Sequence, residues 1–100
     1  MEKRTPHCKL SVIRGFVERG EVRATVSAFN GARELHITDL AGMCSVVMSL
    51  KSADFYKSMT THADNKIWQD VYHAKTANGD AVYLKLTVID DVLIVSFKEL

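Results

Sequence analysis

The sequence is poor in the residues on which disordered chains and disulfide scaffolds depend. Its 100 residues include one proline, five glycines and two cysteines. So little proline and glycine, together with 47% hydrophobic residues, argues against an intrinsically disordered chain. Cys8 and Cys44 stand alone without a CxxC partner, which excludes a disulfide framework and a zinc knuckle. We expect two reduced thiols, with Cys44 buried.

Long apolar runs are also missing. A helix needs about 18 consecutive apolar residues to cross a membrane, and the sequence has no such run. Residues 1–7 are charged and lack the apolar region of a signal peptide. Because the length suffices for one hydrophobic core, we expect a single cytoplasmic domain over residues 1–100, with no membrane contact.

Metal-binding patterns are absent as well. The histidines do not have the i, i+4 spacing of a helical metal site, and no cluster of histidine and carboxylate residues accompanies them; they are His7, His36, His62 and His73. We therefore expect no metal site and no cofactor. Isolated histidines are usually surface or hydrogen-bonded polar residues, so none of the four is assigned a catalytic role.

The chain has no strong net charge, because its formal charge at pH 7 is only +1. Affinity for nucleic acid comes largely from lysine and arginine, so this value counts against a nucleic-acid binder. The charge is unevenly distributed, however. Residues 1–35 carry seven basic and four acidic side chains, and the remaining residues sum to −2. This pattern suits contacts with a few phosphates, although an ordinary solvated helix face has the same pattern.

Apolar residues spaced by three and four predict helices in the first half of the chain. The first helix should cover residues 9–19 and end at Gly20. A second, short helix should follow a cap at Thr25 or Ser27 and reach Glu34.

Two further cap signals follow. Asp39 is the expected N-cap of a third helix, whose apolar stripe consists of Met43, Val46, Val47 and Leu50. Ser52 resembles another N-cap. It predicts one or two more helical turns, which would carry Phe55, Tyr56 and Lys57.

From Ile67 onward the apolar spacing changes to two. Residues 67–73, 81–89 and 92–98 are runs of β-branched and aromatic residues, separated by the turn signals Asn78-Gly79 and Asp90-Asp91. These runs predict an antiparallel meander. Because the helices precede the strands along the chain, the sequence predicts an α+β fold in which the N-terminal helices pack against one face of the sheet. We expect the first and third helices to make most of this contact.

The hairpin at Asp90-Asp91 determines which polar side chains meet. A two-residue loop pairs Tyr83 with Lys98 and Lys85 with Ser96, all on the face opposite the apolar residues. A phenol and an ammonium group at this spacing can hold one phosphate. The ordinary alternative is that these side chains only keep an exposed sheet face soluble.

Gln69 tests the register of the other hairpin. A two-residue loop at Asn78-Gly79 pairs Gln69 with Val88 and points it into the core, whereas a three-residue loop with a glycine bulge pairs it with Thr87. An unpaired amide in the core is unfavourable. We therefore expect the bulge or another odd-length connection.

Four longer segments carry a resemblance to a known family. They are Met-Glu-Lys-Arg-Thr-Pro-His at 1–7, Asp-Phe-Tyr-Lys-Ser-Met-Thr-Thr at 54–61, Ile-Trp-Gln-Asp-Val-Tyr at 67–72 and Val-Leu-Ile-Val-Ser-Phe-Lys-Glu at 92–99. In order and spacing they resemble the bacterial motility quorum-sensing regulator (MqsR) toxins, and the resemblance covers nearly the whole chain. It implies a fold similar to the RelE-type toxins and an endoribonuclease that cleaves mRNA at short GC-containing sites, commonly GCU.

The resemblance also implies a protein partner. This is an inactivating MqsA-like antitoxin with a zinc-binding N-terminal domain and a helix-turn-helix C-terminal domain. The zinc would belong to that partner, and operator DNA would be contacted only through the complex. The sequence departs from the family pattern mainly between Asn30 and Leu40, around residues 73–80 and at Leu100. Loops often carry recognition contacts, so the cut-site preference and the antitoxin recognised stay open.

Matched residue by residue, the resemblance implies the catalytic residues Lys57, Gln69, Tyr83 and Lys98. Lys57 and Lys98 would stabilise the charge that develops on the phosphorane, Gln69 would orient the RNA, and Tyr83 would donate to or exchange protons with the reacting oxygens. Tyr56 and Lys85 are candidate substrate-binding residues. The general base stays open, because the reference pKa values of lysine and tyrosine are about 10.4 and 10.

One function of a different class competes with the nuclease. The chain could be a non-catalytic module whose sheet edge pairs with another protein and whose basic helices contact DNA as part of a repressor. Only the enzyme is expected to cleave naked RNA without a partner.

Overall fold

The computed structural model describes residues 1–100, and its three α-helices lie where the caps and the apolar spacing predict them: α1 (Leu10–Glu18), α2 (Val26–Glu34) and α3 (Leu40–Met48). Thr25 caps α2 by accepting a hydrogen bond from Ala28 N at 3.0 Å, and Asp39 caps α3 by accepting one from Gly42 N at 2.8 Å. Gly20 follows α1 with a φ of +75°, which favours glycine. None of the helices is long and apolar enough to cross a membrane.

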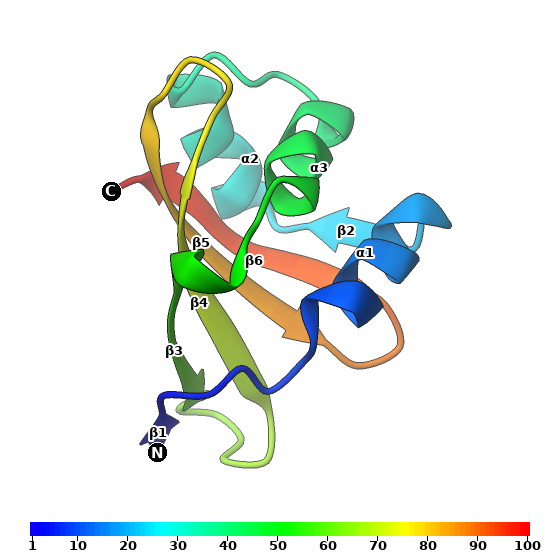
Figure 1. Cartoon of the computed structure of the whole chain (residues 1–100), viewed down its shortest axis with the longest axis vertical. Coiled ribbons are helices and arrows are strands. Elements are labelled where there is room, and N and C mark those ends of the chain that lie inside the picture. The colour runs from blue at the N-terminus through cyan, green and yellow to red at the C-terminus, as the bar shows by residue number, and fades with distance from the viewer.

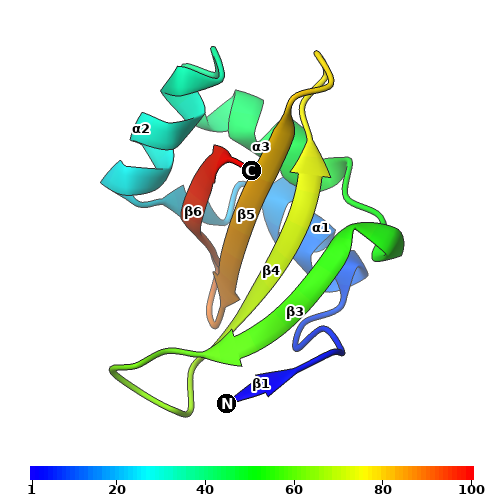
Figure 2. The same cartoon turned by 90° about the vertical axis from the view of Figure 1, so that its left-hand side faces the viewer.

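The sheet is larger than the predicted meander. Its strands are β1 (Glu2–Lys3), β2 (Val22–Ala24), β3 (Phe55–Thr60), β4 (Trp68–Lys75), β5 (Ala81–Val88) and β6 (Val92–Glu99). They lie in the order β1-β3-β4-β5-β6-β2, and every neighbouring pair is antiparallel except β2 with β6. The predicted meander is the β4-β5-β6 centre of this sheet, and the predicted α+β class is confirmed. Figure 2 shows the sheet in front of the helices.

The helical turns predicted to carry residues 55–57 are wrong. Only a single 3-10 turn forms, over Ser52–Asp54, and its N-cap is Lys51, whose N–H donates to Asp54 Oδ2 at 2.9 Å. The chain then enters β3, which pairs with β4 and with β1. Pairing with β4 and β1 outweighs the local cap signal, because aromatic and β-branched side chains pack well on a pleated sheet.

The turn between β5 and β6 is longer than predicted, yet the predicted partners meet. Val88 pairs with Val92, which leaves a three-residue loop at 89–91 and shows that the two-residue loop is wrong. A register shift between Lys85 and Leu86 cancels this difference. The predicted pairs are therefore confirmed: Tyr83 lies opposite Lys98, and Lys85 lies opposite Ser96.

The turn between β4 and β5 confirms the odd-length connection. Thr76 N donates to Asp80 O and Gly79 N donates to Thr76 O, both at 2.9 Å. Gly79 has a φ of +87°, which a side-chain-bearing residue rarely adopts. β4 and β5 keep one register from Lys75–Ala81 to Asp70–Leu86. The next pair in this register is Gln69 with Thr87, as expected for the longer loop.

The core lies between one face of the sheet and the helices. The helix α2 packs there as well as α1 and α3, the two helices predicted to do so. Fully buried side chains come from every helix and from the central strands; they include Ile13, Ala28, Ala32, Met43, Val47, Tyr72, Val82, Leu84, Ile94 and Phe97. At Gly31 the backbone of α2 touches β6, because an added Cβ would lie 1.9 Å from the carbonyl oxygen of Phe97. No helix covers the other face of the sheet, which we call the open face (Figure 1).

The two thiols are free and half-buried. Burial raises the pKa of both Cys8 and Cys44. The predicted burial of Cys44 is only partial. Its side of α3 lines a shallow apolar groove beside α1 and β2 rather than the core.

Candidate active site

The register of four strands lines up polar residues across the open face. One row runs through Lys57 of β3, Val71 of β4, Lys85 of β5 and Ser96 of β6. The next row runs through His73 of β4, Tyr83 of β5 and Lys98 of β6. Because side chains alternate between the two faces of a strand, both rows point away from the helices.

An irregularity in β3 brings two consecutive residues to the open face. Phe55 pairs with Tyr72 and Lys57 pairs with the next residue along β4, Val71, so Tyr56 is an extra residue. The Tyr56 ring stacks on the imidazole of His73, with centroids 4.3 Å apart and planes 20° apart. The stack places Tyr56 beside Lys57 on the open face, with 41% of the residue exposed.

Ammonium groups surround the aromatic rings. Nζ of Lys98 and Nζ of Lys85 lie 5.2 and 5.9 Å from the centre of the Tyr83 ring. Lys57 Nζ lies 5.5 Å from the centre of the Tyr56 ring. At these distances a cation is attracted to the face of an aromatic ring. No group of three or more His, Cys, Asp or Glu side chains is arranged to hold a metal ion.

The three ammonium groups differ in their electrostatic surroundings. Partial burial, and then the nearby Lys98 and Lys57, lower the pKa of Lys85. A hydrogen bond to the Glu2 carboxylate is the largest cause that raises the pKa of Lys57. No carboxylate lies within ion-pair distance of Lys85 or Lys98. This part of the open face therefore attracts an anion.

Gln69 lies on the same face but at the edge of the cluster. It is half-buried and pairs with Met59, one row beyond Lys57 and Val71. Its amide makes no hydrogen bond to another residue of the protein, and it takes no part in the ring contacts around Tyr83. The amide is therefore free to bind a ligand.

The sequence-based predictions missed His73. Its ring lies between Tyr56 and Tyr83, with a centroid distance of 6.4 Å to the Tyr83 ring and an angle of 43° between the two planes. Two signals point to it: alternation in β4 puts His73 on the same face as Gln69, and the hairpin register puts it opposite Tyr83. Neither signal was used, because an isolated histidine is usually a surface or hydrogen-bonded polar residue.

Arg4 was also missed. Its guanidinium carbon lies 5.8 Å from the centre of the Tyr56 ring, so a fourth cation reaches this part of the open face. Arg4 belongs to the chain start, where β1 has only two residues and no periodicity can be read. No signal in the sequence could have found it.

A buried carboxylate holds the chain start in place. Asp70, of which 3% is exposed, accepts hydrogen bonds from His7 N at 3.0 Å, from Cys8 N at 2.9 Å and from the Ser58 hydroxyl. These contacts join the segment before α1 to β3 and β4. We call residues 1–8 the N-terminal arm, since they reach back to the open face through Glu2 and Arg4.

Comparison with known proteins identifies the family. A sequence model described as motility quorum-sensing regulator, toxin of MqsA, matches residues 5–99. The chain belongs to the MqsR toxin family. One curated relative, the mRNA interferase toxin MqsR of Escherichia coli strain K12, is 58% identical over 99 residues, which are 99% of each chain. The resemblance found in the sequence is confirmed.

In this MqsR family member, most of the residues expected in the active site lie close together, and one lies at the edge of the group. The closest group on the open face consists of Tyr56, Lys57, Tyr83, Lys85 and Lys98. Gln69 lies one row away along β4, within the same open face. Lys57 belongs to the sheet itself, where the sequence placed it on a short helix before the first strand.

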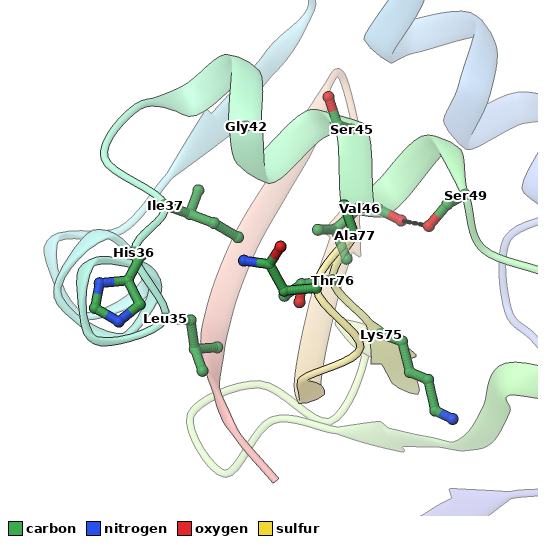
Figure 3. Close-up of a pocket in the computed structure, with 11 residues that line it drawn as sticks. Leu35, His36, Ile37, Gly42, Ser45, Val46, Ser49, Lys75, Thr76 and Ala77 are labelled. Atoms are coloured by element: carbon green, nitrogen blue, oxygen red, sulfur yellow. Dashed lines mark hydrogen bonds between the residues drawn. The ribbon is translucent and has the colours of Figure 1, made fainter.

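This MqsR family member also has a hollow away from the open face. A pocket of about 400 Å³ opens on the helix side, between the end of α2, α3 and the β4–β5 turn. Figure 3 shows Leu35 and Ile37 pointing toward it, with Thr76 and Ala77 opposite. None of the expected site residues lines this pocket. The candidate active site is an exposed surface, which fits an extended polymer better than an enclosed small molecule.

Proposed function

We propose that this MqsR family member is an endoribonuclease that cleaves mRNA and acts as the toxin of a toxin–antitoxin pair. The observation that carries the proposal is the grouping of Lys57, Lys85 and Lys98 around the rings of Tyr56 and Tyr83 on the open face. Ammonium groups bind phosphates, and exposed aromatic rings stack on unpaired bases. The relative from Escherichia coli is described as an mRNA interferase toxin.

Each open-face residue has a part in the proposed reaction. Lys57 and Lys98 stabilise the negative charge that grows on the phosphate oxygens, and the Tyr83 phenol exchanges a proton with a reacting oxygen. Gln69 orients the RNA through its free amide. Tyr56 and Lys85 bind the substrate on either side of the scissile phosphate, Tyr56 by stacking on a base and Lys85 by its charge.

The nucleophile in this proposal belongs to the RNA. A 2′-hydroxyl attacks the adjacent phosphorus, the bond from phosphorus to the 5′-oxygen breaks, and the products end in a 2′,3′-cyclic phosphate and a 5′-hydroxyl. The 2′-hydroxyl is already next to its phosphate, so the protein needs only to orient it and stabilise charge.

The finer parts of the proposal concern specificity and control. We propose cleavage at short GC-containing sites such as GCU in the cytoplasm, by a single domain that needs no cofactor. An MqsA-like antitoxin with a zinc-binding domain and a helix-turn-helix domain neutralises the toxin, and operator DNA is reached only through that complex. The family description, toxin of MqsA, supports the antitoxin.

Cleavage of naked RNA by the purified protein tests the proposal. We expect new 5′-hydroxyl ends in a mixed RNA pool, enriched at GC-containing sites when mapped by sequencing. A Lys98→Ala protein should cut far more slowly, and Lys9→Ala, which changes an exposed lysine beside α1, should cut normally. A pool left intact by the wild-type protein, together with tight DNA binding alongside the antitoxin, would favour the non-catalytic repressor module.

A further inference from the structure

The proposed reaction needs a general base, and none of the residues assigned a role above supplies one. Removal of the 2′-hydroxyl proton requires an acceptor atom that is unprotonated near pH 7, and efficiency is greatest when its pKa lies near the working pH. Lysine and tyrosine have reference pKa values of about 10.4 and 10, whereas that of histidine is about 6.5. Of the four histidines, His73 is the one in the rows of the open face.

The position of His73 is set by rigid neighbours. Its backbone pairs with Tyr83 in the middle of the sheet, and the Tyr56 ring stacks on its imidazole. Neither ring nitrogen hydrogen-bonds to another residue of the protein. The imidazole is therefore oriented by packing, and its nitrogens stay available to a bound molecule.

The charged and titratable groups around His73 come from several elements. On the open face they are Tyr56 and Lys57 of β3, Tyr83 and Lys85 of β5, Lys98 of β6, and Arg4 of the N-terminal arm. On its other side, a hollow that His73 lines is also lined by Lys51, Asp54 and Lys75. Asp54 is the one carboxylate side chain in this set, and its oxygen accepts a hydrogen bond from Lys51 N.

We propose that His73 is the general base of this ribonuclease. The inference rests on the proposed function and names a catalytic residue for it. A ring nitrogen of neutral His73 takes the proton of the 2′-hydroxyl while the 2′-oxygen forms its bond to phosphorus. The bond from phosphorus to the 5′-oxygen breaks, that oxygen takes the proton of the Tyr83 phenol, and water returns the imidazolium proton to the phenolate.

The distances on the open face agree with this division of labour. The imidazole and the phenol lie on adjacent strands with ring centres 6.4 Å apart, so one phosphate can contact both. Lys98, whose Nζ lies 5.2 Å from the centre of the Tyr83 ring, reaches the same phosphate. The proton acceptor His73, the proton donor Tyr83 and the stabilising charge of Lys98 thus lie in one row of the sheet.

His73→Phe separates proton transfer from stacking. Phenylalanine keeps a ring on Tyr56 but has no nitrogen. Under single-turnover conditions, with a GCU-containing RNA oligonucleotide, we expect its cleavage rate to fall about 10²-fold or more. The wild-type and His73→Phe rates should also differ in their dependence on pH, because only the wild-type protein uses a titratable side chain as the proton acceptor. RNA affinity and the melting temperature should stay close to wild type.

Chemical rescue provides a second test. We expect added imidazole to restore part of the activity of His73→Ala in proportion to its concentration, and to leave His73→Phe, whose ring fills the space, slow. The matched control is His36→Asn, on the helix side. His36 has a φ of +64°, which asparagine tolerates, so this variant should keep the wild-type rate and pH profile.

The outcomes also separate this inference from the proposed function. A wild-type protein that leaves the oligonucleotide uncut would overturn the nuclease itself. A wild-type protein that cuts, beside a His73→Phe protein with the same rate and the same dependence on pH, would reject the general base and leave the nuclease standing. Weaker RNA binding with an unchanged chemical rate in His73→Phe would reject it as well and assign His73 to stacking.

Discussion

The Lys57 ammonium donates a 2.7 Å hydrogen bond to the Glu2 carboxylate, which joins β3 to the first residues of the chain. The same hydrogen bond is the largest cause that raises the pKa of Lys57 and lowers that of Glu2. Both groups are therefore charged near neutral pH. An RNA phosphate has to compete with Glu2 for this lysine, whereas Lys85 and Lys98 have no such competitor.

Glu2→Gln should tighten RNA binding. The change removes a negative charge beside the site and frees Lys57 for phosphate, so we expect affinity to rise several-fold at low ionic strength and the gain to shrink in high salt. Binding can be measured by fluorescence anisotropy with a 2′-deoxy-substituted GCU oligonucleotide. Glu21→Gln is the control, because Glu21 is an exposed acid that pairs with Arg19 on the helix side. Weaker binding in Glu2→Gln would instead show that Glu2 positions Lys57.

Lys57→Ala, Tyr83→Phe and Lys98→Ala should each slow cleavage strongly while the protein stays folded. Loss of one donor to the developing charge typically lowers the rate about 10²-fold or more. Exposed ion pairs such as Glu2–Lys57 add little to stability, so the melting temperatures should remain near wild type. Single-turnover rates and thermal melts provide the two readouts. Full activity in Lys98→Ala, or an equal loss of stability and activity in all three, would contradict the assigned roles.

Expression of the toxin alone should arrest growth. If the protein cleaves mRNA, translation fails, and co-expression of the neighbouring antitoxin gene should restore growth through a tight complex. Growth curves and co-purification measure these effects, with Lys98→Ala as the inactive control. Normal growth at high expression of the wild-type protein would argue for a non-catalytic role.

Cleavage should require a 2′-hydroxyl immediately 5′ of the cut and should persist in EDTA. The lysines of the open face supply the positive charge, and the substrate supplies the nucleophile. We expect an oligonucleotide with one 2′-deoxy sugar at that position to stay intact, while the same substitution one nucleotide away leaves cleavage unchanged. Cutting of the first oligonucleotide, or loss of activity in EDTA, would disprove this mechanism.

The sequence predicts the parts of the fold that depend on local signals. Thr25 and Asp39 cap helices because their side chains reach N–H groups three residues ahead. The pairing of Tyr83 with Lys98 was predicted from one hairpin, and it holds because the register shift in β5 offsets the longer loop. β3 was missed because its pairing with β4 and with the distant β1 is a tertiary contact, whereas the cap signal at Ser52 is local. Lys57 was therefore expected on a short helix, whereas it lies on β3.

The candidate site shows the same limit. Tyr83, Lys85 and Lys98 could be grouped from strand alternation, whereas Lys57 and Gln69 came from the family resemblance. The contacts that complete the group depend on the tertiary fold: the stacking of Tyr56 on His73 needs the extra residue in β3, and Arg4 needs the path of the N-terminal arm. Neither can be read from periodicity.

Asp70→Ala should destabilise the protein by about 2–5 kcal/mol. It removes the acceptor of hydrogen bonds from the buried Ser58 hydroxyl and from the part-buried His7 N and Cys8 N. A buried donor without a partner is unfavourable by about 1–3 kcal/mol, and a part-buried donor by less because water can reach it. Urea denaturation measures the change. Asp64→Ala, in the exposed loop between β3 and β4, is the matched control and should be nearly neutral. Equal midpoints for the two variants would contradict the role of Asp70.

The N-terminal arm is attached through Asp70, through the short strand β1 and through the Glu2–Lys57 ion pair, and this attachment has a dynamic consequence. The arm adds only the two residues of β1 to the sheet edge, so its release leaves the four central antiparallel strands paired. Such a segment opens as a separate unit with a smaller free energy than global unfolding. In native-state hydrogen exchange, the backbone N–H groups of residues 2–5, His7 and Cys8 should therefore exchange together and earlier than those of β4 and β5. Each opening removes Glu2 from Lys57 and Arg4 from Tyr56, so the charge of the open face would fluctuate while the protein remains folded.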